Sequence, residues 1–276
     1  MKTKNKIILS LAIFMLCLNM PYLSMAQKLP STQKNGKRAP GSVVIDGDIT
    51  EWQNGFEAYN VGSRIYYELA NDDDNLYLVL RTDDDYGNKK AIYGISLTIA
   101  IPVEKGAKST ENLVITFPPP TNAKYTNPMV ELHDKIRSTR NDGDKGFKEK
   151  IDSMMLVANK QMRKTFTRII VTGIKEIKSP SIPLDSAGCI KASAKYDKMH
   201  FVYELAIPLK YLGNGINEGD KFKYNIRMDG IPAVSPGSGI HTAIIVGASI
   251  MEAEGADGAY VHYPTDLSGT YVLVKK

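Results

Sequence analysis

The pattern of apolar and polar positions predicts mainly β structure from residue 43 onward. Apolar residues alternate with polar ones, or form short β-branched runs, and turn residues separate these segments. The predicted strands are 64–69, 76–81, 92–101, 113–117, 190–196, 199–207, 222–228, 241–248 and 270–274. Asp197 and Lys198 separate two of them and are typical of a hairpin turn. Many short strands with turns between them favour an antiparallel β-sandwich.

A second periodicity interrupts the strands at 121–164. The three prolines at 118–120 end the strand pattern, because proline donates no hydrogen bond to a ladder. Apolar residues then follow the spacing of one helical face from Phe147 to Met162, and Asp144 is placed to cap that helix. A weaker helix is predicted over 129–138. We therefore predict a helical insertion over 121–164 that lies on the sandwich.

The first 26 residues have the pattern of a secretory signal peptide. Three lysines precede an apolar run at 7–18, and Ser24 and Ala26 are the small residues that a signal peptidase reads. The run is shorter than the ~20 residues that cross a bilayer. We expect cleavage after Ala26, export to a periplasm or out of the cell, and no stable membrane insertion after cleavage.

The mature chain is then expected to have two parts. Residues 27–42 are polar, contain prolines and glycines, and carry four basic side chains with no acidic one, which predicts a flexible linker. Residues 43–276 form a single domain. One cysteine, Cys189, remains after cleavage, so no internal disulfide is expected.

Charge and motifs argue against two classes of function. Cleavage removes three lysines and leaves 32 basic and 30 acidic side chains, a net charge of +2. Nucleic-acid binding needs a concentrated basic face, so no nucleic-acid partner is expected. The histidines lack metal-site spacing, and neither a nucleophile elbow nor a glycine-rich phosphate loop occurs. We therefore expect no enzyme activity.

Three phrases resemble one known family. They are 44–52 (VIDGDITEW), 203–213 (YELAIPLKYLG) and 222–229 (FKYNIRMD). They are similar to sequences of family 9 carbohydrate-binding modules and the related DOMON-like domains, with the likeness extending over 43–117 and 188–276. The resemblance implies a jelly-roll-like β-sandwich that binds a glycan without catalysis. It also implies that Trp52 belongs to the fold, with its indole N–H bonded nearby.

Two alternatives remain at this point. The first is a structural or protein-interaction module of the cell envelope without glycan affinity. The second is a haem-binding protein, since some DOMON-like relatives hold haem, with Met228 or a histidine as the iron ligand.

The resemblance also directs attention to particular side chains. Family 9 modules clamp their sugar between two tryptophans, whereas Trp52 is the single tryptophan of this chain. Tyrosines near loops would have to replace the clamp, because a tyrosine offers a flat apolar face and a hydroxyl. We therefore predict ligand contacts at Tyr86, Tyr93, Tyr260 and Tyr263.

A metal prediction rests on an acidic turn. Family 9 modules can carry structural calcium, and Asp72, Asp73 and Asp74 offer three carboxylates in the turn 71–75 (NDDDN). A solvated hairpin turn is the alternative interpretation. The segment 82–87 (TDDDYG) is a second acidic turn with the same two interpretations. No other cofactor is expected.

Overall fold

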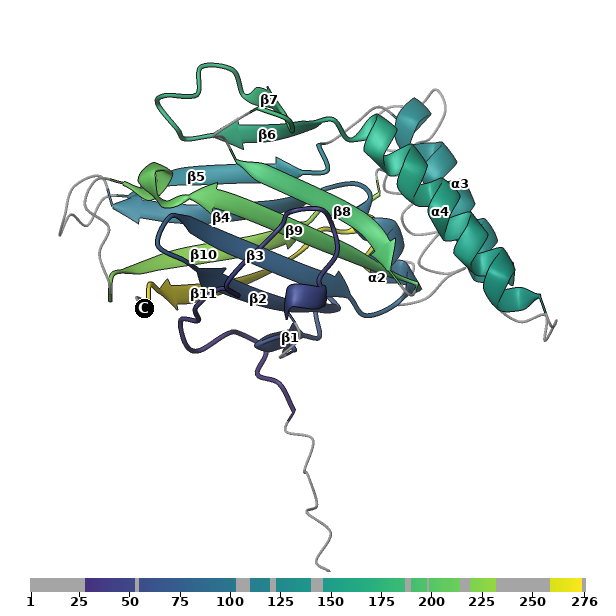
Figure 1. Cartoon of the computed structure of the whole chain (residues 1–276), viewed down its shortest axis with the longest axis horizontal. Coiled ribbons are helices and arrows are strands. Elements are labelled where there is room, and N and C mark those ends of the chain that lie inside the picture. Colours follow the sequence, from purple (N-terminus) through teal and green to yellow (C-terminus); the bar gives the residue numbers. More distant parts are fainter. Residues whose placement is uncertain are drawn as a thin grey trace, which may run out of the picture.

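The protein is a sandwich of two antiparallel β-sheets with a helical hairpin at one end (Figure 1). The computed structural model describes residues 28–52, 55–102, 110–119, 123–139, 146–186, 190–197, 199–213, 219–231 and 259–274. The predicted fold class, a mainly β antiparallel sandwich with a helical insertion, is confirmed. The expected signal peptide, Asp144, Cys189, Lys198 and the predicted strand 241–248 lie outside the described residues.

The first sheet has five strands in the order β1-β2-β3-β9-β8. They are β1 (Ala58–Asn60), β2 (Ile65–Asn71), β3 (Asn75–Thr82), β9 (His200–Pro208) and β8 (Lys191–Asp197). The predicted hairpin between residues 190 and 207 is β8 and β9, which pair from Lys191–Ala206 to Asp197–His200. The short helix η2 (Leu209–Leu212) follows β9, because Pro208 ends the ladder.

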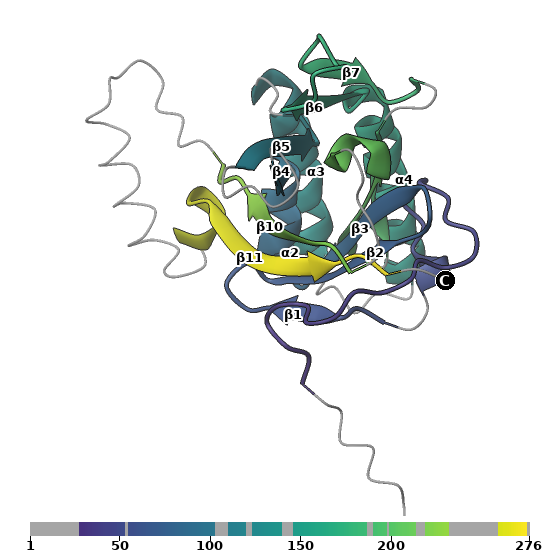
Figure 2. The same cartoon turned by 90° about the vertical axis from the view of Figure 1, so that its left-hand side faces the viewer.

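The second sheet has six strands in the order β11-β10-β4-β5-β6-β7 (Figure 2). They are β11 (Thr265–Val272), β10 (Lys221–Met228), β4 (Ile95–Pro102), β5 (Thr110–Phe117), β6 (Arg168–Thr172) and β7 (Ser181–Pro183). On β10 the burial alternates strictly, with Phe222, Tyr224, Ile226 and Met228 facing inward. The polar side chains between them face away from the core.

The core lies between the two sheets. Tyr67 and Leu78 from the first sheet and Leu97 and Ile226 from the second are fully or almost fully buried there. One polar contact crosses this core, since the hydroxyls of Tyr67 and Tyr224 lie 3.0 Å apart. That contact satisfies the Tyr224 hydroxyl, which would otherwise be buried at a cost, whereas the Tyr67 hydroxyl also accepts from Gln33 N at 3.1 Å.

A second, smaller core covers the outer face of the five-stranded sheet. The N-terminal strap, residues 28–52, crosses this face and packs Ala39, Val43, Ile45, Ile49 and Trp52 against Ala70, Tyr77, Val79 and Ala206. The alternation in 203–207 predicts one buried face for this strand. The structure corrects this, because Glu204 and Ala206 on the other face are also buried, 1% and 6% exposed, beneath the strap.

The predicted flexible linker is therefore also corrected. Most of it is the first half of the strap and packs on the sandwich. Gln33 is 3% exposed, and its side-chain amide donates to Leu69 O (2.8 Å) and accepts from Leu69 N (2.7 Å). Arg38 forms a parallel bridge with Asn71 at the end of β2. The polar composition of this segment predicts exposure to solvent. In the structure the polar side chain of Gln33 instead bonds the backbone of β2 at Leu69, beyond the residues of β2 that pair with β1.

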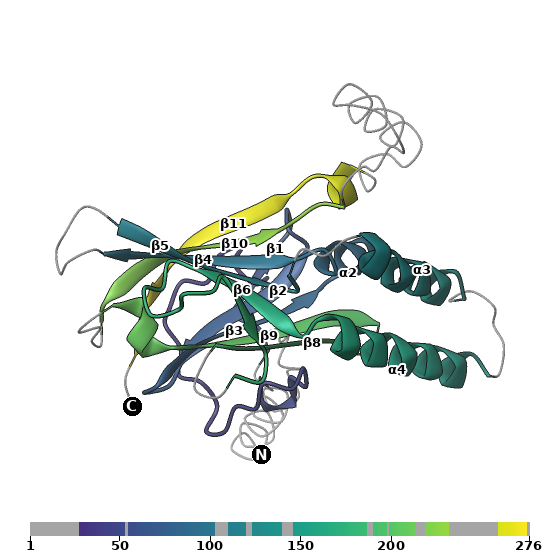
Figure 3. The same cartoon turned by 90° about the horizontal axis from the view of Figure 1, so that it is seen from above.

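The helical insertion consists of two antiparallel helices that project from one end of the sandwich (Figure 3). They are α3 (Ala123–Thr139) and α4 (Phe147–Thr165). The N-cap of α4 is Gly146, and not Asp144 as predicted. Asn159 of α4 fixes the pair to the free edge of β8, donating to Tyr196 O (3.0 Å) and accepting from Tyr196 N (2.7 Å). Apolar residues on the inner sides of both helices join the main core.

A third helix replaces the second predicted acidic turn. Helix α2 (Asp85–Ala91) begins there, and Asp84 caps it by accepting from Gly87 N at 2.7 Å. The predicted strand 92–101 accordingly starts later, at Ile95. Among the described residues, no helix is long and apolar enough to cross a membrane.

Candidate functional site

Trp52 and Glu204 join two of the phrases that carry the family resemblance. Glu204 lies beneath the strap and accepts from Asp46 N (3.2 Å), Gly47 N (2.7 Å) and Trp52 Nε1 (3.1 Å). Burial raises the pKa of Glu204 to about 7, although the N–H donors of Gly47, Trp52 and Asp46 oppose the rise. Trp52 is 7% exposed and meets the Tyr77 ring edge-on. The prediction that Trp52 is a core residue is confirmed.

The acidic turn at 71–75 is held by hydrogen bonds of its own. Asp72 accepts from Asp74 N (2.8 Å), Asn75 N (2.6 Å) and the Tyr77 hydroxyl (2.6 Å). Burial opposes these bonds, which still hold the pKa of Asp72 below its usual value. Asp73 forms an ion pair of 2.9 Å with Arg38, and the backbone oxygen of Asp74 accepts from Leu209 N.

The carboxylates of Asp72 and Asp73 thus have protein partners in the structure. Among the described residues, no three His, Cys, Asp or Glu side chains are grouped where they could hold a metal ion. Calcium binding by Asp72, Asp73 and Asp74 stays a prediction.

Three of the four predicted tyrosines surround two cationic side chains. The Arg64 guanidinium lies 4.3 Å from the centre of the Tyr260 ring and 5.9 Å from that of Tyr86. Lys90 Nζ lies 4.3 Å from the Tyr260 ring and donates to the backbone oxygen of Tyr263 at 2.7 Å. Tyr260 is 8% exposed, and its hydroxyl donates to Ser63 O.

The exposure of these rings differs. Tyr263 is 53% exposed, Tyr86 is half-buried in the first turn of α2, and Tyr93 is half-buried against the main core. Cations already contact the Tyr260 ring, so that ring stabilises the loop before β11. Ligand contacts by these four tyrosines stay a prediction, and Tyr263 is the one that presents most surface.

Lys90 is the centre of this cluster. It is fully buried, and its Nζ donates to Tyr260 O (3.1 Å), Tyr263 O (2.7 Å) and Thr265 Oγ1 (2.9 Å). Burial lowers the pKa of Lys90 to about 8, with Asp229 opposing the shift. The ammonium therefore fixes residues 260–265 to α2 and positions the start of β11.

Met228 and three of the four histidines named for the haem alternative lie among the described residues, and His241 lies outside them. Met228 is fully buried in the main core, and His133 stacks on Tyr196 at a centroid distance of 6.1 Å. His200 Nδ1 lies 2.9 Å from Thr82 O, and His262 Nδ1 lies 3.0 Å from Ile231 O. These four side chains therefore occupy separate positions that packing and hydrogen bonds already use.

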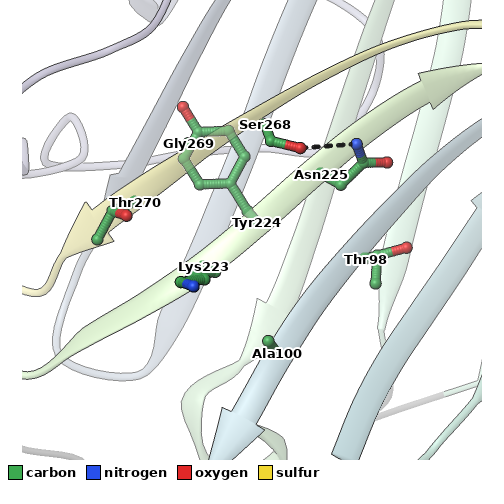
Figure 4. Close-up of a pocket in the computed structure, with 8 residues that line it drawn as sticks. All are labelled: Thr98, Ala100, Lys223, Tyr224, Asn225, Ser268, Gly269 and Thr270. Atoms are coloured by element: carbon green, nitrogen blue, oxygen red, sulfur yellow. Dashed lines mark hydrogen bonds between the residues drawn. The ribbon is translucent and has the colours of Figure 1, made fainter. Parts of the chain in front are cut away.

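A hollow of about 370 Å³ opens on the outer face of the six-stranded sheet (Figure 4). It spans β4, β10 and β11. Register aligns its lining side chains in two rows across the strands. Thr98, Asn225 and Ser268 form one row, and Ala100, Lys223 and Thr270 form the other.

Small side chains make this hollow. Ala100 contributes a single methyl group, and Gly269 has no side chain. A Cβ on Gly269 would overlap the inward-facing Tyr224 ring, so the residue must be glycine where β10 and β11 pair. Tyr224 and Gly269 both line the hollow, and Tyr224 is 3% exposed.

The lining carries hydrogen-bonding groups of both kinds. Asn225 Nδ2 donates to Ser268 Oγ (3.0 Å) and to Asp266 Oδ2 (2.8 Å), which leaves its Oδ1 as an acceptor facing outward. Within the described part of the chain, the Thr98 and Thr270 hydroxyls and the Lys223 ammonium have no protein partner. Lys223 is the charged side chain among the lining residues. The arrangement can hydrogen-bond a polyhydroxylated molecule and can neutralise an anionic group on it.

Sequence reasoning did not find this site. The lining residues come from three strands, with those of β10 at least 123 positions after those of β4 and 43 to 47 positions before their partners on β11. Each looks like an ordinary solvent-facing residue of an amphipathic strand. The alternation on 222–228 marks Lys223 and Asn225 as outward-facing. Only the strand order brings Thr98 and Ser268 beside them.

Comparisons with known proteins give one likeness to report. No protein-family model matches the chain, and no curated protein matches it. Among solved structures, the chain is similar to a family 9 carbohydrate-binding module from Caldicellulosiruptor kristjanssonii in complex with glucose. The two chains are 11% identical, the TM-score is 0.40, and the alignment covers 88% of this chain and 97% of that chain.

Proposed function

We propose that the protein binds carbohydrate, without catalysis, in the hollow across β4, β10 and β11. One observation carries the proposal: hydroxyl, amide and ammonium groups line an open hollow in two register-aligned rows. Sugar hydroxyls both donate and accept, so they can pair with such a set. Export, which the first 26 residues predict, belongs to the same proposal.

Affinity and preference follow from the lining. Tyr224 is the aromatic residue among the lining residues and is 3% exposed, so sugar C–H groups have little ring surface to stack on there. We expect dissociation constants on the order of 0.1–1 mM, about −4 to −5.5 kcal/mol. The Lys223 ammonium favours sugars with a carboxylate or sulfate over neutral ones. Tyr263 lies at most ~18 Å along the chain from Ser268, so a longer oligosaccharide can reach it.

Titration calorimetry and chemical-shift mapping test the proposal. The protein is titrated with neutral oligosaccharides, such as xylo- and cello-oligomers, and with an acidic one, oligogalacturonate. Asn225→Ala and Thr98→Val should each weaken binding about tenfold. Lys223→Gln should weaken binding of the acidic oligomer alone. Thr172→Val is the matched control, because Thr172 is exposed on the same face of β6, in register with Val114 of β5.

Two results would count against the proposal. If no glycan perturbs the resonances of Thr98, Asn225 or Ser268, the hollow is not a sugar site. Release of reducing sugar that persists through repurification and is lost in a hollow variant would show catalysis.

A second candidate, a protein-interaction module, is favoured by one feature. Leu156 and Val157 of α4 are 66% and 55% exposed. Contiguous exposed apolar surface marks interaction sites when it is large, and these two adjacent side chains are the start of such a surface on α4.

A further inference from the structure

The outward face of α4 carries an apolar centre between two charged ends. Its inward face buries Ile151, Ala158 and Met162 against α3 and the sandwich. Leu156 lies on the opposite side and is 66% exposed, with Val157 beside it at 55%. The α3–α4 hairpin projects from the end of the sandwich (Figure 3), so this face is accessible to another macromolecule.

The charges on this face are arranged symmetrically about Leu156. Glu149 and Asp152 precede it by seven and four residues, and Lys160 and Arg163 follow it by four and seven. The acidic pair and the basic pair are thus mirror images in spacing and opposite in sign. All four side chains are exposed, and in the part of the chain that the structure describes none forms an ion pair.

Helix geometry places these residues in one narrow stripe. At about 100° per residue, all four charged residues project within roughly 40° of Leu156. At a rise of 1.5 Å per residue, the inner charges lie ~6 Å and the outer charges ~10.5 Å from Leu156 along the axis. The stripe is therefore acidic at one end, apolar in the middle and basic at the other end.

We propose that α4 is the contact surface of a homodimer, in which two copies of α4 pack antiparallel with Leu156 near the two-fold axis. With the two-fold axis at Leu156, a residue that precedes Leu156 by a given number of positions lies beside the partner residue that follows Leu156 by the same number. Glu149 then lies beside the partner's Arg163, and Asp152 beside the partner's Lys160. Four ion pairs flank an apolar centre made of two Leu156 and two Val157 side chains.

The pattern favours a second copy over other occupants. A purely basic partner would leave Lys160 and Arg163 facing like charges, and an anionic membrane surface would meet Glu149 and Asp152. A copy of the same helix in the antiparallel direction pairs each of these four charges with its opposite, whereas the exposed Lys148 and Lys164 project about 80° from Leu156, at the edge of the contact. Antiparallel packing also aligns the helix dipoles favourably. The contact is small, so we expect a reversible dimer at micromolar concentration or weaker.

Sedimentation equilibrium over a range of concentrations tests the dimer. The protein beginning at Gln27, the expected mature form, should shift reversibly from monomer to dimer. Leu156→Asp should weaken the dimer at least tenfold, since it places two carboxylates near the axis. Val61→Asp is the matched control, because Val61 is 61% exposed in the turn between β1 and β2 and should have no effect.

A charge exchange tests the symmetry itself. Glu149→Lys with Asp152→Lys makes the stripe wholly basic and should weaken the dimer at least tenfold. Adding Lys160→Glu and Arg163→Glu restores a self-complementary stripe of reversed polarity and should recover most of the affinity. Far-UV circular dichroism confirms that each variant is folded.

Three outcomes would overturn the proposal. One is a wild-type protein that stays monomeric up to ~1 mM, a range where even weak specific contacts show. Another is a dimer that tolerates Leu156→Asp. The third is a quadruple variant as weak as the double variant. Binding of a monomeric protein to vesicles of anionic lipid through Leu156 would assign the stripe to a membrane surface instead.

Discussion

The indole N–H of Trp52 donates a hydrogen bond of 3.1 Å to the Glu204 carboxylate, across 152 positions of sequence. The same carboxylate accepts the backbone N–H groups of Asp46 and Gly47. The segments 44–52 and 203–213, which both carry the family resemblance, are therefore joined by one buried cluster of hydrogen bonds. This explains why an acidic residue stands in the middle of an apolar strand.

Trp52→Ala should lower the free energy of unfolding by about 3–5 kcal/mol, because it empties the second core and leaves Glu204 with one donor fewer. Trp52→Phe keeps an aromatic ring and loses the N–H, so it should cost about 1–3 kcal/mol. Urea unfolding followed by circular dichroism measures both. A Trp52→Ala variant as stable as wild type would show that the strap contributes little.

Glu204 should make stability depend on pH between about 4.5 and 7. Its folded pKa is raised to about 7, so the folded protein binds more protons than the unfolded chain in that interval. Its contribution is thus full below pH 4.5 and is lost as the pH rises through 7. Glu68, whose pKa burial also raises, contributes with the same sign.

Glu204→Gln distinguishes the contribution of Glu204 to this pH dependence from that of Glu68. The amide should remove the Glu204 part of the slope and lower stability at neutral pH, because its NH₂ group faces a donor. Denaturation midpoints at half-unit intervals of pH measure the slope in both proteins. An unchanged slope would assign the dependence to other groups.

Lys90 should give a slope of the opposite sign at higher pH. Its folded pKa of about 8 lies below the usual 10.5, so the unfolded chain binds more protons between these values. Stability should therefore rise with pH from about 8 to 9.5 in wild type. Lys90→Met should flatten this rise, even if it lowers stability throughout because three acceptors lose their donor. Thermal melts in a single buffer series provide the comparison.

Asn159→Ala should loosen the α3–α4 hairpin from β8. The amide replaces a neighbouring strand at Tyr196, so its loss leaves a backbone N–H and C=O without partners and should cost about 1–3 kcal/mol. Hydrogen exchange at Tyr196 should accelerate. Lys150→Ala is the control, since Lys150 is exposed on the same helix and lies outside the stripe around Leu156. Equal effects of the two substitutions would contradict the role of the amide.

Much of the fold follows from periodicity. The alternation over 222–228 and the helical spacing over 147–162 are local signals, and both elements form where they predict. The acidic start of α2 was misinterpreted because Gly87 made the segment look like a turn. The strap was missed for a different reason. Gln33 is polar and looks solvent-exposed in sequence, and its burial depends on an unpaired stretch of β2 more than thirty positions away.

The candidate site was less accessible to prediction. The four tyrosines were chosen as aromatic residues near loops, and three of them do gather, around Arg64 and Lys90. No sequence motif marks the hollow, because the pairing register of three strands produces it. Thr98 meets Asn225 and Asn225 meets Ser268 only once three distant strands have paired. No local pattern encodes that alignment.

The strap also links the first described residues to the last ones. Lys37 N donates to the Tyr271 hydroxyl, and Arg38 donates to Val274 O, contacts that span 234 and 236 positions. These contacts cannot form during synthesis until the final strand has been made. The polypeptide consequently remains an incomplete sandwich for almost the whole of its translation.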